Sequence, residues 1–238
     1  NLDYETTTEY SLTVTVTDSG GLTDTATATI AVVNVDEVAP TITSAATGNA
    51  DENQNVLYTV TSDDSADVSD GVSYSLTADN DGGLLSIDAN TGEVTLTAGN
   101  LNFEDKSEYV FTVVATDAAG NSSNQSVTID VNDVNEAPVA QDNADLSVSE
   151  DAANDTVVGS ITSSDVDDGD SLSYAISAGN DDGIFAIDEN GQITVADNSN
   201  LDYETTTEYS LTVTVTDSGG LTDTATATIA VVNVDEVA

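Results

Sequence analysis

Apolar and hydroxyl-bearing side chains alternate along several stretches of the chain. Leu12, Val14 and Val16 occupy every second position, with Thr between them. The same period of two runs through residues 109–113, 127–131 and 209–215. Because alternate side chains of an extended strand point to opposite faces, each stretch is predicted to be a β-strand. One face of each strand would be apolar and the other hydroxyl-bearing.

Clusters of Asp, Asn and Gly separate these stretches, at residues 18–21, 79–83, 90–92 and 179–183. Such residues adopt the positive φ angles of tight turns at low cost. An acidic, Thr-rich chain with few aromatic residues could also be disordered, but a regular period of two argues against disorder. Short strands between such turns predict an all-β protein built of Greek-key, immunoglobulin-like β-sandwiches.

Repetition sets the domain organisation. The words LDYE, LNFE and LDYE begin at Leu2, Leu101 and Leu201, and residues 1–39 are identical to residues 200–238. The words therefore recur about every 100 residues, and repeats of this length indicate tandem domains in an elongated array. Pro40 and Pro138 follow acidic linkers and are each expected to open a new strand. The predicted units are therefore 1–39, the last part of one repeat, and the complete repeats 40–137 and 138–238, each of about 100 residues.

Each complete repeat is expected to bury a modest core of its own. In the repeat 40–137 we expect this core to be led by Ile42, Tyr58, Tyr74, Leu85, Ile87, Tyr109 and Val113. Residues 1–39 would lack an opposing sheet to cover the apolar face formed by Leu12, Val14, Val16 and Ile30. We expect the other half of that repeat to be cleaved, disordered or supplied by a neighbouring molecule.

The charge of the chain limits the kinds of partner that it can bind. It carries 45 acidic residues and one basic residue, Lys106, for a formal net charge of −44. Such a charge implies bound cations and excludes nucleic acid and anionic membrane surfaces as partners, although acidic groups can also serve solubility alone. The chain has no Cys, so no disulfide or thiolate ligand is possible, and no apolar run suggests direct membrane insertion.

The carboxylates gather in turns and linkers. In the last repeat, oxygen donors occur at Glu150, at Asp165, Asp167 and Asp170, at Asp202 and Glu204, at Asp217, and at Asn233, Asp235 and Glu236. Ca²⁺ takes six to eight oxygen ligands at about 2.3–2.6 Å, and a set without His or Cys fits Ca²⁺ better than zinc or copper. Paired carboxylates could also serve glycoside hydrolysis. The absence of His, Cys, Arg and Trp argues against an enzyme.

These motifs resemble the cadherin repeat, and in particular the cadherin-like tandem repeats of large bacterial surface and secreted adhesins. The resemblance covers the whole chain. It rests on LDYE and LNFE, on DVD at Asp165, and on the strand-end residues Asp18, Asp117 and Asp217. The acidic linkers before the two prolines and the segments GLLSIDANTGEVTL and GIFAIDENGQITV complete it.

The resemblance implies that Ca²⁺ ions are shared at the junctions between repeats. At the first junction Asp3, Glu5, Asn34, Asp36 and Glu37 would face Asp64, Asp67, Asp70 and Asp117. At the second junction Glu52, Asn102, Glu104, Asp133, Asn135 and Glu136 would face Asp165, Asp167, Asp170 and Asp217. A third group, Glu150, Asp202, Glu204, Asn233, Asp235 and Glu236, would bind incompletely without a following repeat. Asn102 departs from the family's Asp, which leaves two or three ions per junction open.

Other acids are interpreted as solvated turn residues, namely Asp79, Asp81, Asp181 and Asp182. The predicted function is that of a calcium-dependent cell-adhesion segment at the cell surface, in which Ca²⁺ stiffens an extender of a bacterial adhesin. The alternative is calcium-dependent recognition of a carbohydrate or a protein, including homophilic binding. Calcium and the neighbouring repeats are the expected partners, with a surface glycan or protein as a possible ligand.

Overall fold

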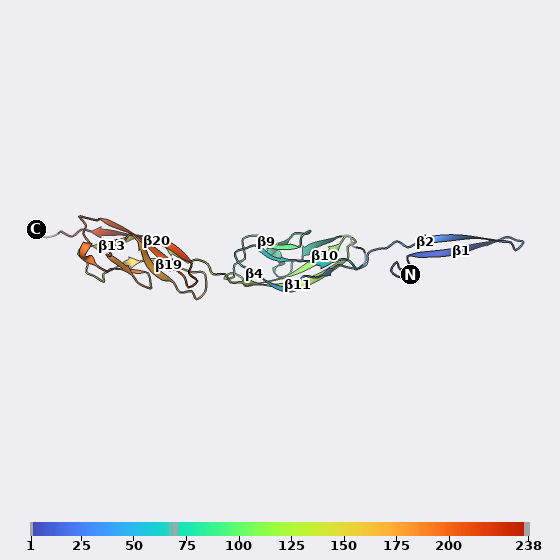
Figure 1. Cartoon of the computed structure of the whole chain (residues 1–238), viewed down its shortest axis with the longest axis horizontal. Coiled ribbons are helices and arrows are strands. Elements are labelled where there is room, and N and C mark those ends of the chain that lie inside the picture. The colour runs from blue at the N-terminus through green and yellow to red at the C-terminus, as the bar shows by residue number, and fades with distance from the viewer. Residues whose placement is uncertain (1, 67, 69–70, 236–238) are drawn as a thin grey trace. The chain divides into compact units, whose positions relative to one another are not determined.

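The computed structural model describes residues 2–66, 68 and 71–235 (Figure 1). The chain divides into two compact units, Asn1–Asp133 and Val134–Ala238. Apart from two short 3-10 helices, η1 (Asn80–Leu84) and η2 (Asn198–Asn200), the regular elements in the described part of the chain are β-strands. The predicted all-β fold class is confirmed.

The first unit begins with a β-hairpin. Strands β1 (Glu9–Thr17) and β2 (Thr23–Ala31) pair antiparallel, with Tyr10 opposite Ile30. The turn between them is held by Asp18, whose Oδ1 accepts hydrogen bonds from the amides of Gly20 at 2.8 Å and Leu22 at 2.9 Å. These two strands form a two-stranded sheet of their own. The apolar face of the hairpin is exposed, as the sequence predicted.

A β-sandwich follows in the same unit. Its strands are β3 (Thr41–Ile42), β4 (Thr47–Asp51), β5 (Val56–Thr59), β6 (Ser62–Asp63), β7 (Val72–Leu76), β8 (Leu85–Ile87), β9 (Glu93–Leu96), β10 (Glu108–Asp117) and β11 (Ser122–Asn132). One sheet has the order β4-β11-β10-β7, a second has β5-β9-β8, and β3 pairs with β6. Strand β4 runs parallel to β11, with Ala50 opposite Val131. Strand β3 begins directly after Pro40, as expected.

The core of this sandwich lies between its sheets. Leu85, Tyr109 and Val113 are buried, as predicted. The other four predicted residues, Ile42, Tyr58, Tyr74 and Ile87, are partly buried and pack against the core. The largest fully buried side chains here are Phe111, Leu101 and Ile129. Inward positions of the long strands therefore contribute more of the core than the short strands do.

The second unit repeats this architecture. Its strands are β12 (Val139–Gln141), β13 (Asn143–Ser149), β14 (Val157–Ser160), β15 (Thr162–Ser164), β16 (Ser173–Ala178), β17 (Phe185–Ile187), β18 (Gln192–Val195), β19 (Glu208–Thr216) and β20 (Thr222–Val232). The sheets are β13-β20-β19-β16, β14-β18-β17 and β12-β15. Strand β13 runs parallel to β20, with Val148 opposite Val231. The core includes Ile161, Ile184, Ile193, Leu211 and Ile229.

Candidate metal centres

A buried glutamate marks the end of the first strand of the large sheet in the first sandwich. Glu52 follows β4 and is 4% exposed. Its amide donates to the carbonyl of Asn132 at 3.2 Å, and its Oε2 accepts from the amide of Phe103 at 2.9 Å. Single carboxylate oxygens of Glu52, Glu104 and Asp133 lie within 4.8 Å of one another. Three predicted ligands thus converge, and Asn102 lies in the same loop.

The second sandwich places its own residues in the same way. Glu150 follows β13, and its Oε2 accepts from the amide of Tyr203 at 2.8 Å, while Oε1 accepts from Val234 at 2.5 Å. Oxygens of Glu150, Asp202 and Glu204 lie within 4.8 Å of one another. An open cavity of about 350 Å³ is lined by Glu150, Asp202 and Asp235, among others.

Asn233 belongs to the same group, because its side-chain amide donates to Oε1 of Glu204 at 2.8 Å. Glu236, the remaining predicted member, lies outside the described residues.

The other end of the second sandwich carries a second acidic group. Strand β19 is antiparallel to β20, so Asp217, at the end of β19, lies beside the start of β20. Glu150 adjoins the other end of β20. Oxygens of Asp165, Asp170 and Asp217 lie within 4.8 Å of one another. Asp217 is 6% exposed. Its Oδ1 accepts from the amide of Leu221 at 2.7 Å.

Residues of the linker contact this acidic group. The side-chain amide of Asn135 donates to Oδ2 of Asp217 at 2.9 Å. The amide of Glu136 donates to Oδ2 of Asp167 at 2.9 Å, and the amide of Asp167 donates to Oδ1 of Asp165 at 3.2 Å. These five residues, together with Asp170, therefore form one oxygen-rich group within the second unit.

Asp117 occupies the corresponding position in the first sandwich. It is 5% exposed, and its Oδ1 accepts from the amides of Gly120 at 2.7 Å and Asn121 at 2.8 Å. The side chain of Asn121 donates both to Oδ2 of Asp117 at 2.9 Å and to the carbonyl of Asp36 at 3.1 Å. Asp64 is partly buried. Asp67 and Asp70, also predicted as ligands, lie outside the described residues.

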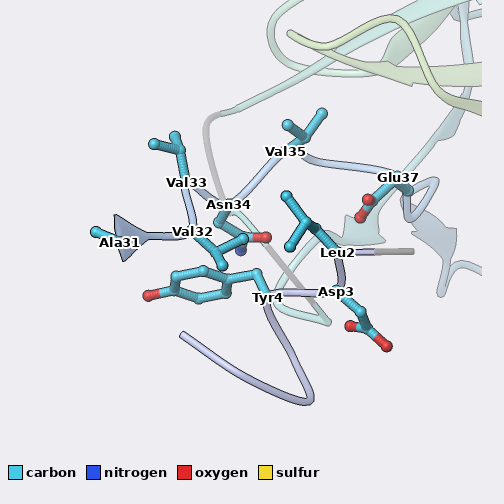
Figure 2. A pocket seen from close by; sticks show the side chains of 9 residues that line it. All are labelled: Leu2, Asp3, Tyr4, Ala31, Val32, Val33, Asn34, Val35 and Glu37. Atoms are coloured by element: carbon cyan, nitrogen blue, oxygen red, sulfur yellow. The ribbon is translucent and has the colours of Figure 1, made fainter. Parts of the chain in front are cut away.

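The predicted ligands of the N-terminal hairpin form no close group of three carboxylates among the described residues, although Asp3, Asn34 and Glu37 line one cavity. Oδ1 of Asp3 accepts from the amide of Glu5 at 3.1 Å, which is the bonding of a local turn. Asn34 and Glu37 line a cavity of about 270 Å³ at the base of the hairpin (Figure 2). Among the described residues, the close groups of three carboxylates include none of the predicted ligands of the first junction.

Electrostatics keeps the most buried aspartates charged. Burial alone would raise the pKa of Asp217, but hydrogen bonds from the Asn135 side chain and from nearby amides outweigh it, and the pKa is lowered. Burial is likewise the largest single influence on Asp117, and hydrogen bonds from Asn121 and neighbouring amides again lower the pKa. Both carboxylates are therefore anionic at neutral pH and available as ligands.

The donor set fits a hard cation. Within the described part of the chain, Asp165 Oδ2 and Asp170 Oδ2 are buried and have no hydrogen-bond partner. A buried carboxylate oxygen without a partner is costly, and close like charges repel one another. A bound Ca²⁺ would compensate both costs, since it prefers carboxylate and carbonyl oxygens. The arrangement of Asp165, Asp170 and Asp217 is therefore suited to binding such an ion.

Two turn acids behave differently from the solvated residues that the sequence suggested. Oδ2 of Asp81 accepts from the amide of Val110 at 2.8 Å, and Oδ1 pairs with Nζ of Lys106 at 3.2 Å. Oδ2 of Asp79 accepts from the hydroxyl of Thr112 at 3.0 Å. These acids therefore fix η1 against β10 instead of capping only their own turn. Asp181 and Asp182 are exposed.

Sequence reasoning missed Asn121. This residue links Asp117 to the carbonyl of Asp36, whereas the corresponding position of the second sandwich is Leu221. No motif distinguishes Asn121 from an ordinary turn residue. In the part of the chain that the structure describes, no helix is long and apolar enough to cross a membrane.

Comparison with known proteins identifies the domain family of these repeats. The cadherin domain model matches residues 45–132 and 144–232. The chain is 32% identical over 249 aligned residues to the protocadherin-like wing polarity protein stan of Drosophila melanogaster, covering 100% of this chain and 7% of that protein. It is 33% identical over 249 residues to human Protocadherin Fat 4, covering 99% of this chain and 5% of that protein. The chain thus spans only a small part of these relatives.

Solved structures show the same fold. A crystal structure of mouse Cadherin-23 EC22-24 is 26% identical, with a TM-score of 0.54, covering 98% of this chain and 77% of that one. Human Protocadherin-24 EC1-2 is 24% identical, with a TM-score of 0.60, covering 83% of this chain and 100% of that one. With both sandwiches matched by the domain model, the chain belongs to the cadherin family.

Proposed function

We propose that this chain is a calcium-dependent segment of an extracellular cell-adhesion protein. In this proposal Ca²⁺ ions bind at the junctions between repeats and stiffen the array, which separates a recognition site from the cell surface. Membership of the cadherin family supports an adhesive and non-enzymatic role at the cell surface. The relatives named above are animal proteins, so they give no support to the bacterial source that the sequence resemblance implied.

The observation that carries the proposal is the acidic group of the second sandwich. Asp165 and Asp170 each bury a carboxylate oxygen that lacks a hydrogen-bond partner among the described residues, beside the anionic Asp217. Solubility does not require acids to be buried together, because an exposed carboxylate is solvated without cost. A cation explains both the burial and the proximity of these groups.

Each junction in the proposal is built from two half-sites. At the second junction the half-site of the first unit, Glu52, Asn102, Glu104 and Asp133, would share ions with the half-site Asn135, Glu136, Asp165, Asp167, Asp170 and Asp217. At the first junction Asp3, Glu5, Asn34, Asp36 and Glu37 would share ions with Asp64, Asp67, Asp70 and Asp117. This assignment treats residues 1–39 as the last part of a repeat and residues 40–137 and 138–238 as complete repeats.

Recognition is the second candidate function. Cadherin-family membership favours protein partners, including copies of the same protein. A glycan ligand has weaker support, because Trp, a common stacking platform for sugars, is absent from the chain.

Calorimetric titration with Ca²⁺ tests the metal proposal. Asp165→Asn, which keeps the size of the side chain and removes one charge, is expected to weaken at least one binding event roughly tenfold or more, about 1.4 kcal/mol. Asp181→Asn, at an exposed turn position, is the matched control and should leave the titration unchanged. Equal losses in both variants would mean that calcium acts only as a nonspecific counter-ion, and the proposal would fail.

A further inference from the structure

The two sandwiches hold an equivalent buried aspartate in turns of the same backbone bonding. Asp117 ends β10 and Asp217 directly follows β19. Each accepts a hydrogen bond through Oδ1 from the amide four residues later, at 2.8 Å in the first sandwich and 2.7 Å in the second. The two turns, residues 117–121 and 217–221, differ in which side chain donates to Oδ2 of the aspartate.

In the second sandwich this donor comes from the linker that precedes the sandwich. The side-chain amide of Asn135 donates to Oδ2 of Asp217 at 2.9 Å and to the carbonyl of Glu136 at 3.0 Å. The last residue of the turn is Leu221, whose side chain has no hydrogen-bond donor. The linker is therefore joined to the turn by a linker side chain.

In the first sandwich the donor comes from the turn. The side-chain amide of Asn121, the last residue of the turn, donates to Oδ2 of Asp117 at 2.9 Å and to the carbonyl of Asp36 at 3.1 Å. Asp36 takes the linker position of Asn135, since each lies between a Val and a Glu. Oδ1 of Asp36 accepts from the amide of Val38 at 3.3 Å, within the linker itself. Linker and turn are thus joined with the donor on the opposite side.

A third position distinguishes the two arrangements. Gly219 lies against the side chain of Asn135, because a Cβ added to Gly219 would be 2.8 Å from Nδ2 and closer still to Oδ1 and Cγ. The corresponding residue of the first turn is Ala119, which carries that Cβ. The φ of Gly219 lies outside the left-handed region, so glycine serves here to leave space and not to permit a special backbone conformation.

We propose that these positions form two alternative pairings between a linker and the sandwich that follows it. The Asn-linker pairing consists of Asn135 with Gly219 and Leu221. The Asp-linker pairing consists of Asp36 with Ala119 and Asn121. The turn of a sandwich thereby selects the linker that can precede it, which fixes the order in which the two kinds of repeat follow one another. These hydrogen bonds need no metal ion, so the proposal is independent of calcium binding.

Each mismatched combination fails for a physical reason. An Asp linker against the turn of Gly219 and Leu221 would bring a second carboxylate to the anionic Asp217 with no amide between the two charges. An Asn linker placed like Asn135 would meet the methyl group of Ala119, so its side chain could not occupy the same position. Both pairings in this chain are of the matched kind.

Substitutions in the second unit test the proposal, because they can convert one pairing into the other. Asn135→Asp removes the linker donor, and Gly219→Ala displaces it. The triple variant Asn135→Asp/Gly219→Ala/Leu221→Asn rebuilds the Asp-linker pairing. The measurement is the NMR order parameter S² of the backbone amides at positions 135 and 136 of the full chain. Chelator is present, with about 0.3 M NaCl, where a Debye length of about 5–6 Å weakens repulsion between the acidic groups.

In the parent chain both linker amides are expected to be rigid, with S² of about 0.85. Asn135→Asp and Gly219→Ala should each lower S² at these amides to below about 0.6, and the triple variant should return it to the parent value. Leu221→Asn alone is the control. It leaves the contact between Asn135 and Asp217 in place and should match the parent. The amides of β19 should remain rigid in every variant, which shows that the sandwich is folded.

Three results would overturn the proposal. Mobile linker amides in the parent chain would mean that the linker is not joined to the turn. Parent-like S² values in both single variants would mean that other contacts hold the linker. A triple variant as mobile as Asn135→Asp would mean that an amide in the turn cannot replace the amide of the linker.

Discussion

The two identical hairpins form the same strands in very different surroundings. Leu12 is 49% exposed while Leu211, the same residue in the second copy, is fully buried. Strand pairing matches residue for residue, and in both turns the first aspartate accepts a hydrogen bond from the amide four residues later. The local sequence therefore determines the strands, the turn and the register, whereas the rest of the repeat supplies the burial. Since a lone two-stranded hairpin is only marginally stable in water, most of the stability of this segment comes from the half that covers it.

The largest expected difference between the copies is in their apolar side chains. Leu211→Ala should lower the free energy of unfolding of the second sandwich by about 2–5 kcal/mol, because it opens a cavity in a close-packed core. Leu12→Ala removes the same atoms from a half-exposed position and should change stability by less than about 0.5 kcal/mol. Urea unfolding of the two variants measures both values. Similar losses would show that the first copy is also covered.

Calcium is expected to act on the acidic ends and not on the middle of either hairpin. With Kd values of about 10⁻⁴–10⁻³ M, a few millimolar Ca²⁺ would stabilise each site by about 1–2 kcal/mol. Chelation should therefore lower the melting temperature of the second sandwich. Hydrogen exchange at Thr13, in the middle of β1, should be unchanged by chelation. Loss of protection at Thr13 on chelation would mean that calcium supports the strand pairing itself.

The turns provide a smaller and matched effect. Gly220 has a φ of +92° and Gly21 a φ of +88°, and an added Cβ would meet no atom within 4 Å at either site. Replacement by Ala should therefore strain only the backbone, at about 1–2 kcal/mol in each copy. Only Gly220→Ala should lower the unfolding midpoint of the second sandwich. An equal shift of that midpoint in Gly21→Ala would show that the first hairpin unfolds together with the second sandwich.

The smallest expected effect concerns pH. The amide of Ala140 donates to Asp223 and lowers the pKa of its carboxyl below the ordinary value, with a further contribution from the amide of Thr224. A carboxyl whose pKa is lowered by folding stabilises the fold at any pH above its unfolded-state pKa of about 3.9. This contribution is lost as the pH falls through the lower, folded-state pKa.

Asp223→Ala should therefore destabilise the second sandwich at pH 7, and the difference from the parent chain should narrow in strong acid. Asp24→Ala, the same change in the first copy, should have little effect at either pH. Chemical unfolding at the two pH values makes this comparison. A difference for Asp223→Ala that did not depend on pH would assign its effect to packing.

Much of the fold could be predicted from local pattern. The alternation through residues 209–215 predicted β19, and Pro40 and Pro138 marked the starts of β3 and β12. The core was predicted less well, because Tyr58 and Tyr74 are large and apolar but lie on short strands at its margin. Phe111 and Ile129 occupy inward positions of long paired strands and are fully buried. Which apolar residues reach the centre depends on how the sheets pack, and periodicity alone does not specify that.

The candidate sites also contain residues that the sequence predicted and contacts that it could not predict. The sequence identified Glu52, Glu104 and Asp133, and Asp165, Asp170 and Asp217, as members of common groups, and each set lies close together. The roles of Asp81 and Asn121 could not be anticipated, because both depend on residues distant in sequence. Asp81 bonds to the amide of Val110, and Asn121 to the carbonyl of Asp36. Such contacts follow from tertiary structure and leave no local motif.

Small-angle X-ray scattering of the chain, in millimolar Ca²⁺ and in chelator at matched ionic strength, tests the central claim most directly. If ions at the junctions stiffen the array, the particle should be longer and thinner in Ca²⁺ than in chelator. Its maximum dimension should be larger, and its cross-section smaller, only when Ca²⁺ is present. Identical scattering profiles in the two buffers would contradict the account and leave the acidic groups with no mechanical role.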